Sequence, residues 1–183
     1  MTTMSYVRLF VSLKITDNTA RSAMYTLQNR LGFSALSGLS RCDFWELAFP
    51  GLSSQQALQT TERLVQKTAL FVNPNKHRWH MEAADSSLQE NPVVTLPESV
   101  SASVLVSDRI DGKAESVLEA CEAHTQGAER PVALRRGVWW DLTFSGLDGE
   151  ALRLAVEHSA VTTSRTEGIL ANPHYQDCQI FYP

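Results

Sequence analysis

The sequence predicts an α+β protein made of two tandem β-α-β-α-β modules, whose antiparallel sheets pack together as an intramolecular pseudo-dimer with the helices outside. Three observations lead to this prediction. A tryptophan motif occurs twice, as WELAFPGL from position 45 and as WDLTFSGL from position 140, an offset of 95 residues. Several stretches alternate apolar and polar residues, which is typical of half-buried strands. Between them, apolar residues recur at helical spacing.

Other landmarks extend the repeat in both directions. Arg41 and Ser12 align with Arg136 and Ser107 at the same offset of 95 residues. Asn73-Pro74 corresponds to Asn172-Pro173, where the offset from position 73 to position 172 is 99. The second copy therefore carries four extra residues before this point. Several matches in one order, with a single small insertion, indicate a duplication.

The elements of the first copy follow from alternation and capping residues. Apolar residues alternate along positions 6–14, as in a strand with one buried face. Asp17 supplies a capping oxygen for a helix that ends at Gly32. A long strand is expected over Leu39–Phe49, followed by the Pro50-Gly51 turn and a helix with the Ser53/Gln56 capping-box spacing. Asn73-Pro74 is expected to end that helix, and His77–Met81 to form the last strand.

The second copy repeats this plan. The expected elements are a strand over Val100–Val106, a helix along Ala114–Cys121, a long strand over Val132–Phe144, a helix capped by Asp148 and reaching about Leu170, and a strand over Gln176–Phe181. The predicted domains are residues 1–81 and 100–183. Residues 82–99, which contain Asp85-Ser86-Ser87, Pro92 and Pro97, are expected to be a linker.

Aromatic residues on both faces of the long strands indicate how the copies associate. Phe44 stands beside Trp45, and Trp139 beside Trp140. Since helices on one face of an antiparallel sheet leave the other face to be covered, we expect the two sheets to meet, with Trp45 and Trp140 packing between the copies. A binding hot spot for a partner is the alternative role of these two tryptophans.

The composition excludes several classes of partner. The chain of 183 residues has a net charge of −4 without blocks of like charge, so neither a nucleic acid nor an anionic membrane is expected as a partner. No apolar run approaches the roughly 20 residues of a membrane span. The N-terminal residues lack the pattern of a signal peptide, and the widely spaced Cys42, Cys121 and Cys178 favour reduced thiols. A cytoplasmic location is expected.

Short motifs in both copies resemble the PurS family, the small subunit of phosphoribosylformylglycinamidine synthase. In the first copy these are VRLFVSLK at 7–14, LGF at 31–33, Arg41 followed by Glu46-Leu47, and LFVNP at 70–74. In the second copy they are Arg136-Gly137, Asp141-Leu142 and ILANP at 169–173. The resemblance covers nearly all of the chain outside the expected linker.

The resemblance implies a role in assembly. PurS proteins are non-catalytic subunits that bridge an ATP-using synthetase and a glutaminase in purine biosynthesis, and this chain resembles a fused PurS dimer. It implies PurL-like and PurQ-like partners, no cofactor and no catalytic residue, and leaves further homodimerisation open. Candidate docking residues are Lys14, Arg41, Asn73, Arg136 and Asn172.

These residues also have simpler structural interpretations. The arginines could pair with a carboxylate or lie in solvent, and the asparagines could satisfy the last carbonyls of a helix. The copies also depart from each other: Asp108-Arg109 replaces Leu13-Lys14, and the second copy lacks the Leu-Gly landmark. A regulatory metabolite-binding module, a recruited paralogue with another partner, and an enzyme with a cleft between the repeats are the alternatives.

No established catalytic or metal-binding motif occurs in the sequence. There is no phosphate-binding glycine loop, no GxSxG elbow, no HExxH and no paired-cysteine pattern. His77 and His80, three residues apart on an expected strand, should point to opposite faces and not share a metal. Cys121 lies on the apolar stripe of a helix and is expected to be a core residue.

Overall fold

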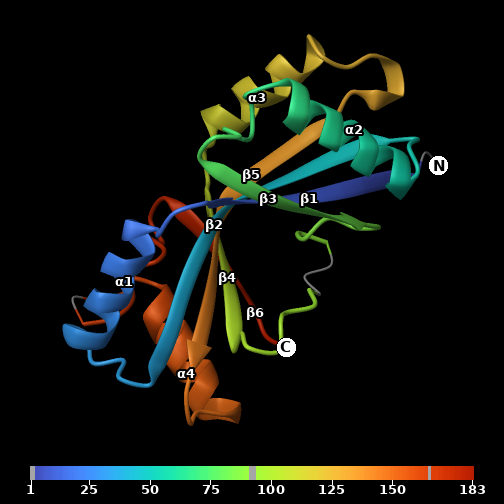
Figure 1. Cartoon of the computed structure of the whole chain (residues 1–183). Helices are drawn as coiled ribbons and strands as arrows, with labels where there is room; N and C mark the ends of the chain where they lie inside the picture. Colours follow the sequence, from blue (N-terminus) through green and yellow to red (C-terminus); the bar gives the residue numbers. More distant parts are fainter. Residues whose placement is uncertain (1–2, 91–93, 165) are drawn as a thin grey trace. The chain divides into compact units, whose positions relative to one another are not determined.

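The computed structural model describes residues 3–90, 94–164 and 166–183. The elements follow the order strand, helix, strand, helix, strand twice, as the sequence predicts (Figure 1). The strands are β1 Met4–Leu13, β2 Leu36–Pro50, β3 His77–Ala84, β4 Ala102–Asp108, β5 Ala133–Phe144 and β6 Gln176–Phe181. The helices are α1 Asn18–Asn29, α2 Ser54–Lys67, α3 Gly112–Glu122 and α4 Gly149–Ala160. Among the described residues, every helix is too short or too polar to cross a bilayer.

The strands form one antiparallel sheet in the order β3-β1-β2-β5-β4-β6. The α+β class is therefore confirmed. The expectation of two separate sheets differs from this finding, because the long strands β2 and β5 are neighbours and continue the sheet from one repeat into the other. The register is matched in the two repeats, since Arg8 lies opposite Glu46 and Ser103 lies opposite Asp141, each 95 residues further on.

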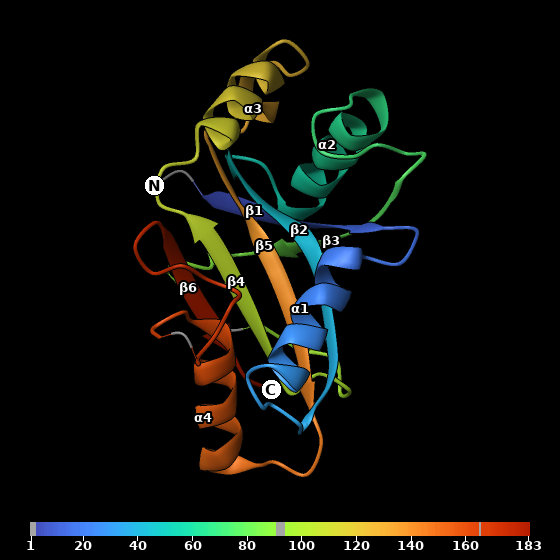
Figure 2. The same cartoon turned by 90° about the vertical axis from the view of Figure 1, so that its left-hand side faces the viewer.

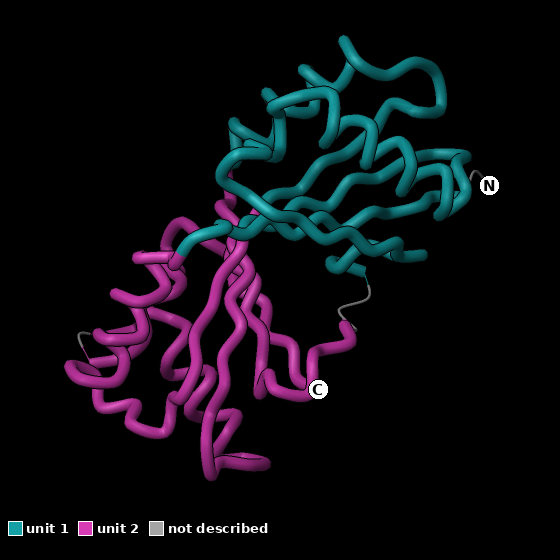
Figure 3. The backbone as a smooth tube through the Cα atoms, in the orientation of Figure 1, with its two compact units in different colours: residues 1–15, 43–92, 111–136 teal, residues 16–42, 93–110, 137–183 magenta. Residues whose placement is uncertain are grey.

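The chain divides into two compact units, and each contains elements from both repeats (Figure 3). Unit 1 comprises residues 1–15, 43–92 and 111–136, and unit 2 comprises residues 16–42, 93–110 and 137–183. Helix α1 of the first repeat thus belongs to unit 2, and helix α3 of the second repeat belongs to unit 1. The units do not coincide with the sequence modules 1–81 and 100–183.

In unit 1, helices α2 and α3 cover one face of the strands (Figure 1). The buried core contains alternate residues of β1 and β2 together with residues of both helices. Its members include Val7, Leu9, Trp45, Leu64 and Val117. Fully burying one such side chain stabilises the folded state by about 1.5–3 kcal/mol. The alternation of apolar residues in the sequence therefore identifies the buried face of these strands.

In unit 2, helices α1 and α4 lie on the same face of the strands (Figure 2). The core there combines Ala20, Leu27 and Leu36 of the first repeat with Val104 and Trp140 of the second. Asp17 begins α1 as expected, and Gly32 follows the helix with a φ of 81°. The sequence predicts correctly where both helices begin, whereas the exchange of α1 and α3 between the units is not apparent from the periodicity.

The second helix of each repeat ends earlier than the sequence predicts. Helix α2 stops at Lys67 rather than at Asn73, and α4 stops at Ala160 rather than near Leu170. The described residues after each helix end lie outside helices, and the apolar residues that continue the helical spacing, Phe71 and Leu170, are buried in the two cores. In the sequence, a buried apolar residue beyond the end of a helix can therefore have the same spacing as another helical turn.

The expected linker 82–99 is partly structured. Strand β3 extends to Ala84, and residues 85–90 form turns in unit 1 with Leu88 fully buried. Residues 91–93, which include Pro92, lie outside the described residues. The start of this segment therefore belongs to the fold of unit 1.

We predict that Gly137→Ala destabilises the protein. A Cβ at Gly137 would lie 2.6 Å from the Val106 carbonyl oxygen and 2.7 Å from Leu105 Cδ1, so β4 and β5 would have to separate. Overpacking of this kind costs about 1–3 kcal/mol, which urea denaturation would measure. The control is Gly112→Ala, where a Cβ meets nothing within 4 Å. Equal stability of the two variants would contradict the prediction.

Candidate functional site

The repeated arginines each bind an aspartate that begins a helix. In unit 2, Arg41 Nε lies 2.8 Å from Asp17 Oδ2, and Asp17 Oδ1 accepts hydrogen bonds from the Thr19 and Ala20 amides. The Arg41 guanidinium also lies 5.8 Å from the ring centroid of Trp140. Both charged side chains are largely buried. The arginine thus ties the first turn of α1 to β2 and covers a tryptophan of the second repeat.

Unit 1 contains the matching set with the repeats exchanged. Arg136 Nε lies 3.0 Å from Asp111 Oδ2, and Asp111 Oδ1 accepts a hydrogen bond from the Ala114 amide at the start of α3. The Arg136 guanidinium lies 5.9 Å from the ring centroid of Trp45. Here aspartate and arginine come from the second repeat and the tryptophan from the first. Such cation–π contacts contribute about 0.5–1 kcal/mol or more when desolvated.

The environment of Asp17 lowers its pKa. Burial alone would raise the pKa of this carboxyl, but the hydrogen bonds from the Ala20 amide and from Arg41 outweigh burial, so that the pKa lies below its ordinary value. The ionised form is therefore favoured in the folded state. This group belongs to a structural ion pair, and its oxygens are engaged by the helix and by the arginine.

The repeated asparagines shape the turns that precede β3 and β6. Asn73 Oδ1 accepts a hydrogen bond from the Asn75 amide at 3.0 Å, and Asn172 Oδ1 accepts one from the His174 amide at 3.0 Å. This is an Asx turn. The helices have already ended, so the expectation that these side chains satisfy helical carbonyls is wrong. Beside the first turn, Lys14 Nζ donates to the Pro74 carbonyl at 2.6 Å.

A buried ion pair on the face of β1 and β2 opposite α2 was not singled out from the sequence. Arg8 Nε lies 3.5 Å from Glu46 Oε2, and both residues are almost fully buried. Arg8 also lies 3.5 Å from Glu82. The signal was present, because Glu46 is the one charged residue in the otherwise apolar stretch 44–49 of β2. At the matching positions of unit 2, Ser103 Oγ donates to Asp141 Oδ1 at 2.5 Å.

Glu46 holds residues 86–88 against the sheet. Its two oxygens accept hydrogen bonds from Ser87 Oγ at 2.7 Å and from the Leu88 amide at 3.0 Å. Arg8 donates to the Ser86 carbonyl at 3.4 Å. We call residues 86–88 the strap. Because the strap and Arg8 engage both carboxylate oxygens, the carboxylate has a structural role in this state.

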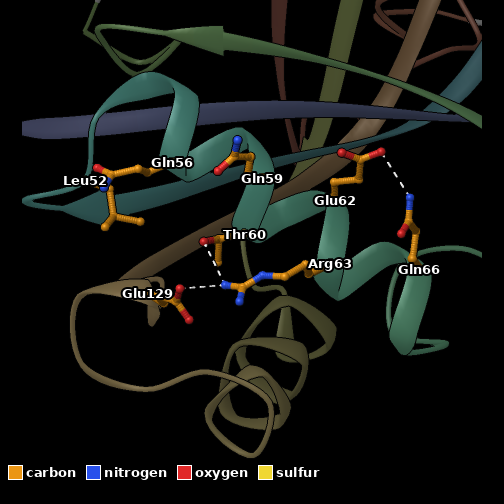
Figure 4. Close-up of a pocket in the computed structure, with 8 residues that line it drawn as sticks. All are labelled: Leu52, Gln56, Gln59, Thr60, Glu62, Arg63, Gln66 and Glu129. Atoms are coloured by element: carbon orange, nitrogen blue, oxygen red, sulfur yellow. Dashed lines mark hydrogen bonds and ion pairs between the residues drawn. The ribbon is translucent and has the colours of Figure 1, made fainter.

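A polar hollow lies beside α2 in unit 1 (Figure 4). Its volume is about 470 Å³. The lining residues are Leu52, Gln56, Gln59, Thr60, Glu62, Arg63, Gln66 and Glu129. Arg63 lies 2.7 Å from Glu129 and 3.2 Å from Thr60, and Gln66 donates to Glu62 at 3.0 Å. Most polar groups of this hollow are therefore paired with one another.

The cysteines and histidines occupy ordinary structural positions. Burial raises the pKa of the Cys121 and Cys178 thiols to about 11, so both are protonated at neutral pH. His77 Nδ1 accepts a hydrogen bond from the Asn73 amide, and His80 stacks on Phe10 with 5.7 Å between the ring centroids. Within the described ranges, no group of three or more His, Cys, Asp or Glu side chains is placed to hold a metal ion.

The comparisons with known proteins identify no relative. Neither a protein-family model nor a curated protein matches the chain.

We predict that Asp17→Asn lowers the stability of the protein at neutral pH and makes that stability less dependent on pH in the acid range. The pKa of Asp17 is lowered by folding, so its contribution is present above the unfolded value of about 3.9 and is lost as the pH falls through the lower folded value. Asparagine still caps the helix, and the expected loss of about 1 kcal/mol reflects the bond to Arg41.

Urea denaturation between pH 2 and pH 7 measures this effect. The matched control is Asp148→Asn at the start of α4, where the aspartate side chain makes no capping hydrogen bond. The control should lose less stability at neutral pH than Asp17→Asn does. If both variants behave alike, the lowered pKa of Asp17 does not contribute to stability.

We predict that Glu46→Leu costs about 3–5 kcal/mol, because it removes the buried carboxylate beside Arg8 and leaves this buried charge beside the partly exposed Glu82. The double variant Arg8→Met/Glu46→Leu should cost clearly less. Both variants should speed hydrogen exchange at the Leu88 amide, which loses its acceptor. A double-mutant cycle from urea denaturation measures the coupling, and additive losses would show that the two side chains do not interact energetically.

Proposed function

We propose that this chain is a non-catalytic, PurS-like assembly subunit, organised as a fused pseudo-dimer, which bridges the synthetase and glutaminase subunits of phosphoribosylformylglycinamidine synthase. The observation that carries the proposal is the pair of matched aspartate–arginine–tryptophan sets. In each unit, one repeat supplies the aspartate and arginine and the other repeat supplies the tryptophan. Reciprocal contacts of this kind are the signature of a twofold dimer.

The exchange of helices supports the pseudo-dimer in the same way. Unit 1 takes α3 from the second repeat, and unit 2 takes α1 from the first. In a dimer of single modules, these contacts would cross between two chains. Joining the modules in one chain raises their effective concentration to the millimolar range. The fused form therefore keeps the association of the two modules at any protein concentration.

The state of the charged side chains favours a scaffold over a catalyst. Asp17, Asp111 and Glu46 accept hydrogen bonds from backbone amides and pair with arginines. Catalytic carboxylates need an open path to a reacting group, whereas these are engaged by the fold. A cytoplasmic location, where purine synthesis takes place and thiols remain reduced, is part of the proposal.

A metabolite-binding module is the second candidate, and the polar hollow beside α2 favours it. Its volume of about 470 Å³ lies in the range of small-molecule sites. Such sites are usually lined by apolar and aromatic residues, whereas Leu52 is the one apolar residue lining this hollow among those described. The assembly role is therefore the better supported of the two.

The proposal predicts that the chain co-purifies with the synthetase and glutaminase subunits of its own organism, in a complex that responds to ATP or glutamine. The variant Lys14→Ala/Asn73→Ala should weaken the complex about tenfold or more, since these residues form the exposed turn beside β3. The matched control is Lys67→Ala, an exposed lysine at the end of α2.

Isothermal titration and sedimentation would measure the affinity. Absence of binding to either subunit, together with unaltered purine synthesis in a strain lacking the gene, would refute the assembly role. Saturable binding of a small metabolite to the isolated protein, abolished by Arg63→Ala in the hollow, would support the second candidate instead.

A further inference from the structure

Strand β3 lies at one edge of the sheet. All eight of its residues pair with β1, from Leu13 opposite His77 to Tyr6 opposite Ala84. In the strand order for the described residues, β3 has no neighbour on its other side. An edge strand presents alternate amide and carbonyl groups that an added strand can bind. Strand β3 is therefore a template for a further strand.

Positive charge gathers at the His77 end of this edge. Lys76 precedes β3, Arg78 lies within it, and Lys14 follows the paired strand β1. Lys14 donates to the Pro74 carbonyl and Arg78 to Ser12 Oγ, both uncharged partners. No carboxylate of the described residues forms an ion pair with any of these three cations. The nearest acid on the strand is Glu82, which is bound by Arg8.

An exposed tryptophan follows these cations along β3. Trp79 is 37% exposed, whereas Trp45, Trp139 and Trp140 are at most 6% exposed. Its neighbour His80 has a side chain that is 69% exposed. Aromatic residues flanked by arginine are enriched where proteins bind one another. We call residues Lys14, Lys76, Arg78 and Trp79, with the outer side of β3, the basic edge.

The matching edge of unit 2 lacks this character. Arg109 takes the place of Lys14 and is paired with Asp177, which takes the place of Arg78. Asp108, one residue earlier, accepts a hydrogen bond from Gln176. The tryptophan position is occupied by the half-buried Cys178. Of the two sheet edges, only the edge in the first repeat carries unpaired positive charge together with an exposed tryptophan, as far as the described residues extend.

We propose that the basic edge binds an acidic, extended segment of a partner protein as an added β-strand. The backbone of β3 would supply the hydrogen bonds, and the cations would select the acidic chain. A second copy of this chain is a poor occupant, because its own β3 brings the same positive charges opposite them. The inference rests on charge and edge geometry, and it holds whether or not the partner belongs to purine synthesis.

An NMR titration of the ¹⁵N-labelled full chain tests this proposal with two octapeptides, one alternating Glu and Val and one alternating Lys and Val. At low salt, the acidic peptide should shift the amides of His77–Ala84 and the indole of Trp79, with little change at β6. The basic peptide should shift neither. Raising the salt to about 0.3 M should weaken binding several-fold, because exposed charges are then screened.

The variant Lys76→Glu/Arg78→Glu should weaken binding of the acidic peptide at least tenfold, and the single variant Arg78→Glu should give part of the loss. The matched control Arg21→Glu/Lys67→Glu makes the same change in net charge at exposed helix positions and should bind like the wild type. The amide spectrum of each variant reports whether it is folded.

Three outcomes would overturn the proposal. These are equal shifts with both peptides, equal shifts at β3 and β6, and undiminished binding by Lys76→Glu/Arg78→Glu. Sedimentation of the wild type supplies a further test, since a dimer that dissociates on charge reversal at β3 would assign the edge to a second copy. None of these results bears on the synthetase complex, which is measured separately.

Discussion

The pairing of a helix-capping aspartate with an arginine of the following long strand is the interaction on which the two units depend. The first repeat passes from unit 1 into unit 2 at residues 15–16 and back at 42–43, and the second repeat passes from unit 2 into unit 1 at 110–111 and back at 136–137. Asp17 and Arg41 stand just inside unit 2 at the first pair of passages, and Asp111 and Arg136 stand just inside unit 1 at the second pair. Each ion pair therefore joins the start of a helix to the following long strand, close to where the chain enters and leaves the unit.

The tryptophan beneath each arginine connects this pair to the other repeat. A carboxylate and a guanidinium that are both largely buried need further partners, because desolvation otherwise offsets their attraction. The helix amides supply hydrogen bonds to Asp17, and the ring of Trp140 supplies a favourable face for Arg41. The same arrangement at Asp111, Arg136 and Trp45 shows that the packing was retained in both copies.

Local features of the fold were predictable because they depend on local sequence. Alternation placed the strands, and the capping box at Ser53 and Gln56 is formed as its spacing predicts. Helix ends were not predictable in this way, because buried residues such as Phe71 continue the helical spacing beyond Lys67. The Asn-Pro motif marks a turn several residues after the helix has ended.

The exchange of helices could not be predicted from periodicity. An amphipathic helix specifies that one face is buried, but not which copy of a duplicated sheet it covers. Because the two copies have matching positions, α1 would find a similar apolar surface in either unit. Of the site residues, Arg41 and Arg136 were identified and their carboxylate partners were left open. The pair of Arg8 and Glu46 was missed, because alternation treats Arg8 as an outward residue.

Divergence between matched positions is informative, because two repeats within one chain can change independently of each other. In a dimer of identical chains, a substitution on one edge appears on both. Here an ion pair of Arg8 with Glu46 stands where the other copy has Ser103 bonded to Asp141. In the first copy Glu46 holds the strap against the sheet by accepting hydrogen bonds from Ser87 Oγ and the Leu88 amide, and Arg8 adds a hydrogen bond to the Ser86 carbonyl. The fold thus remains alike in both copies while their surfaces acquire different chemistry.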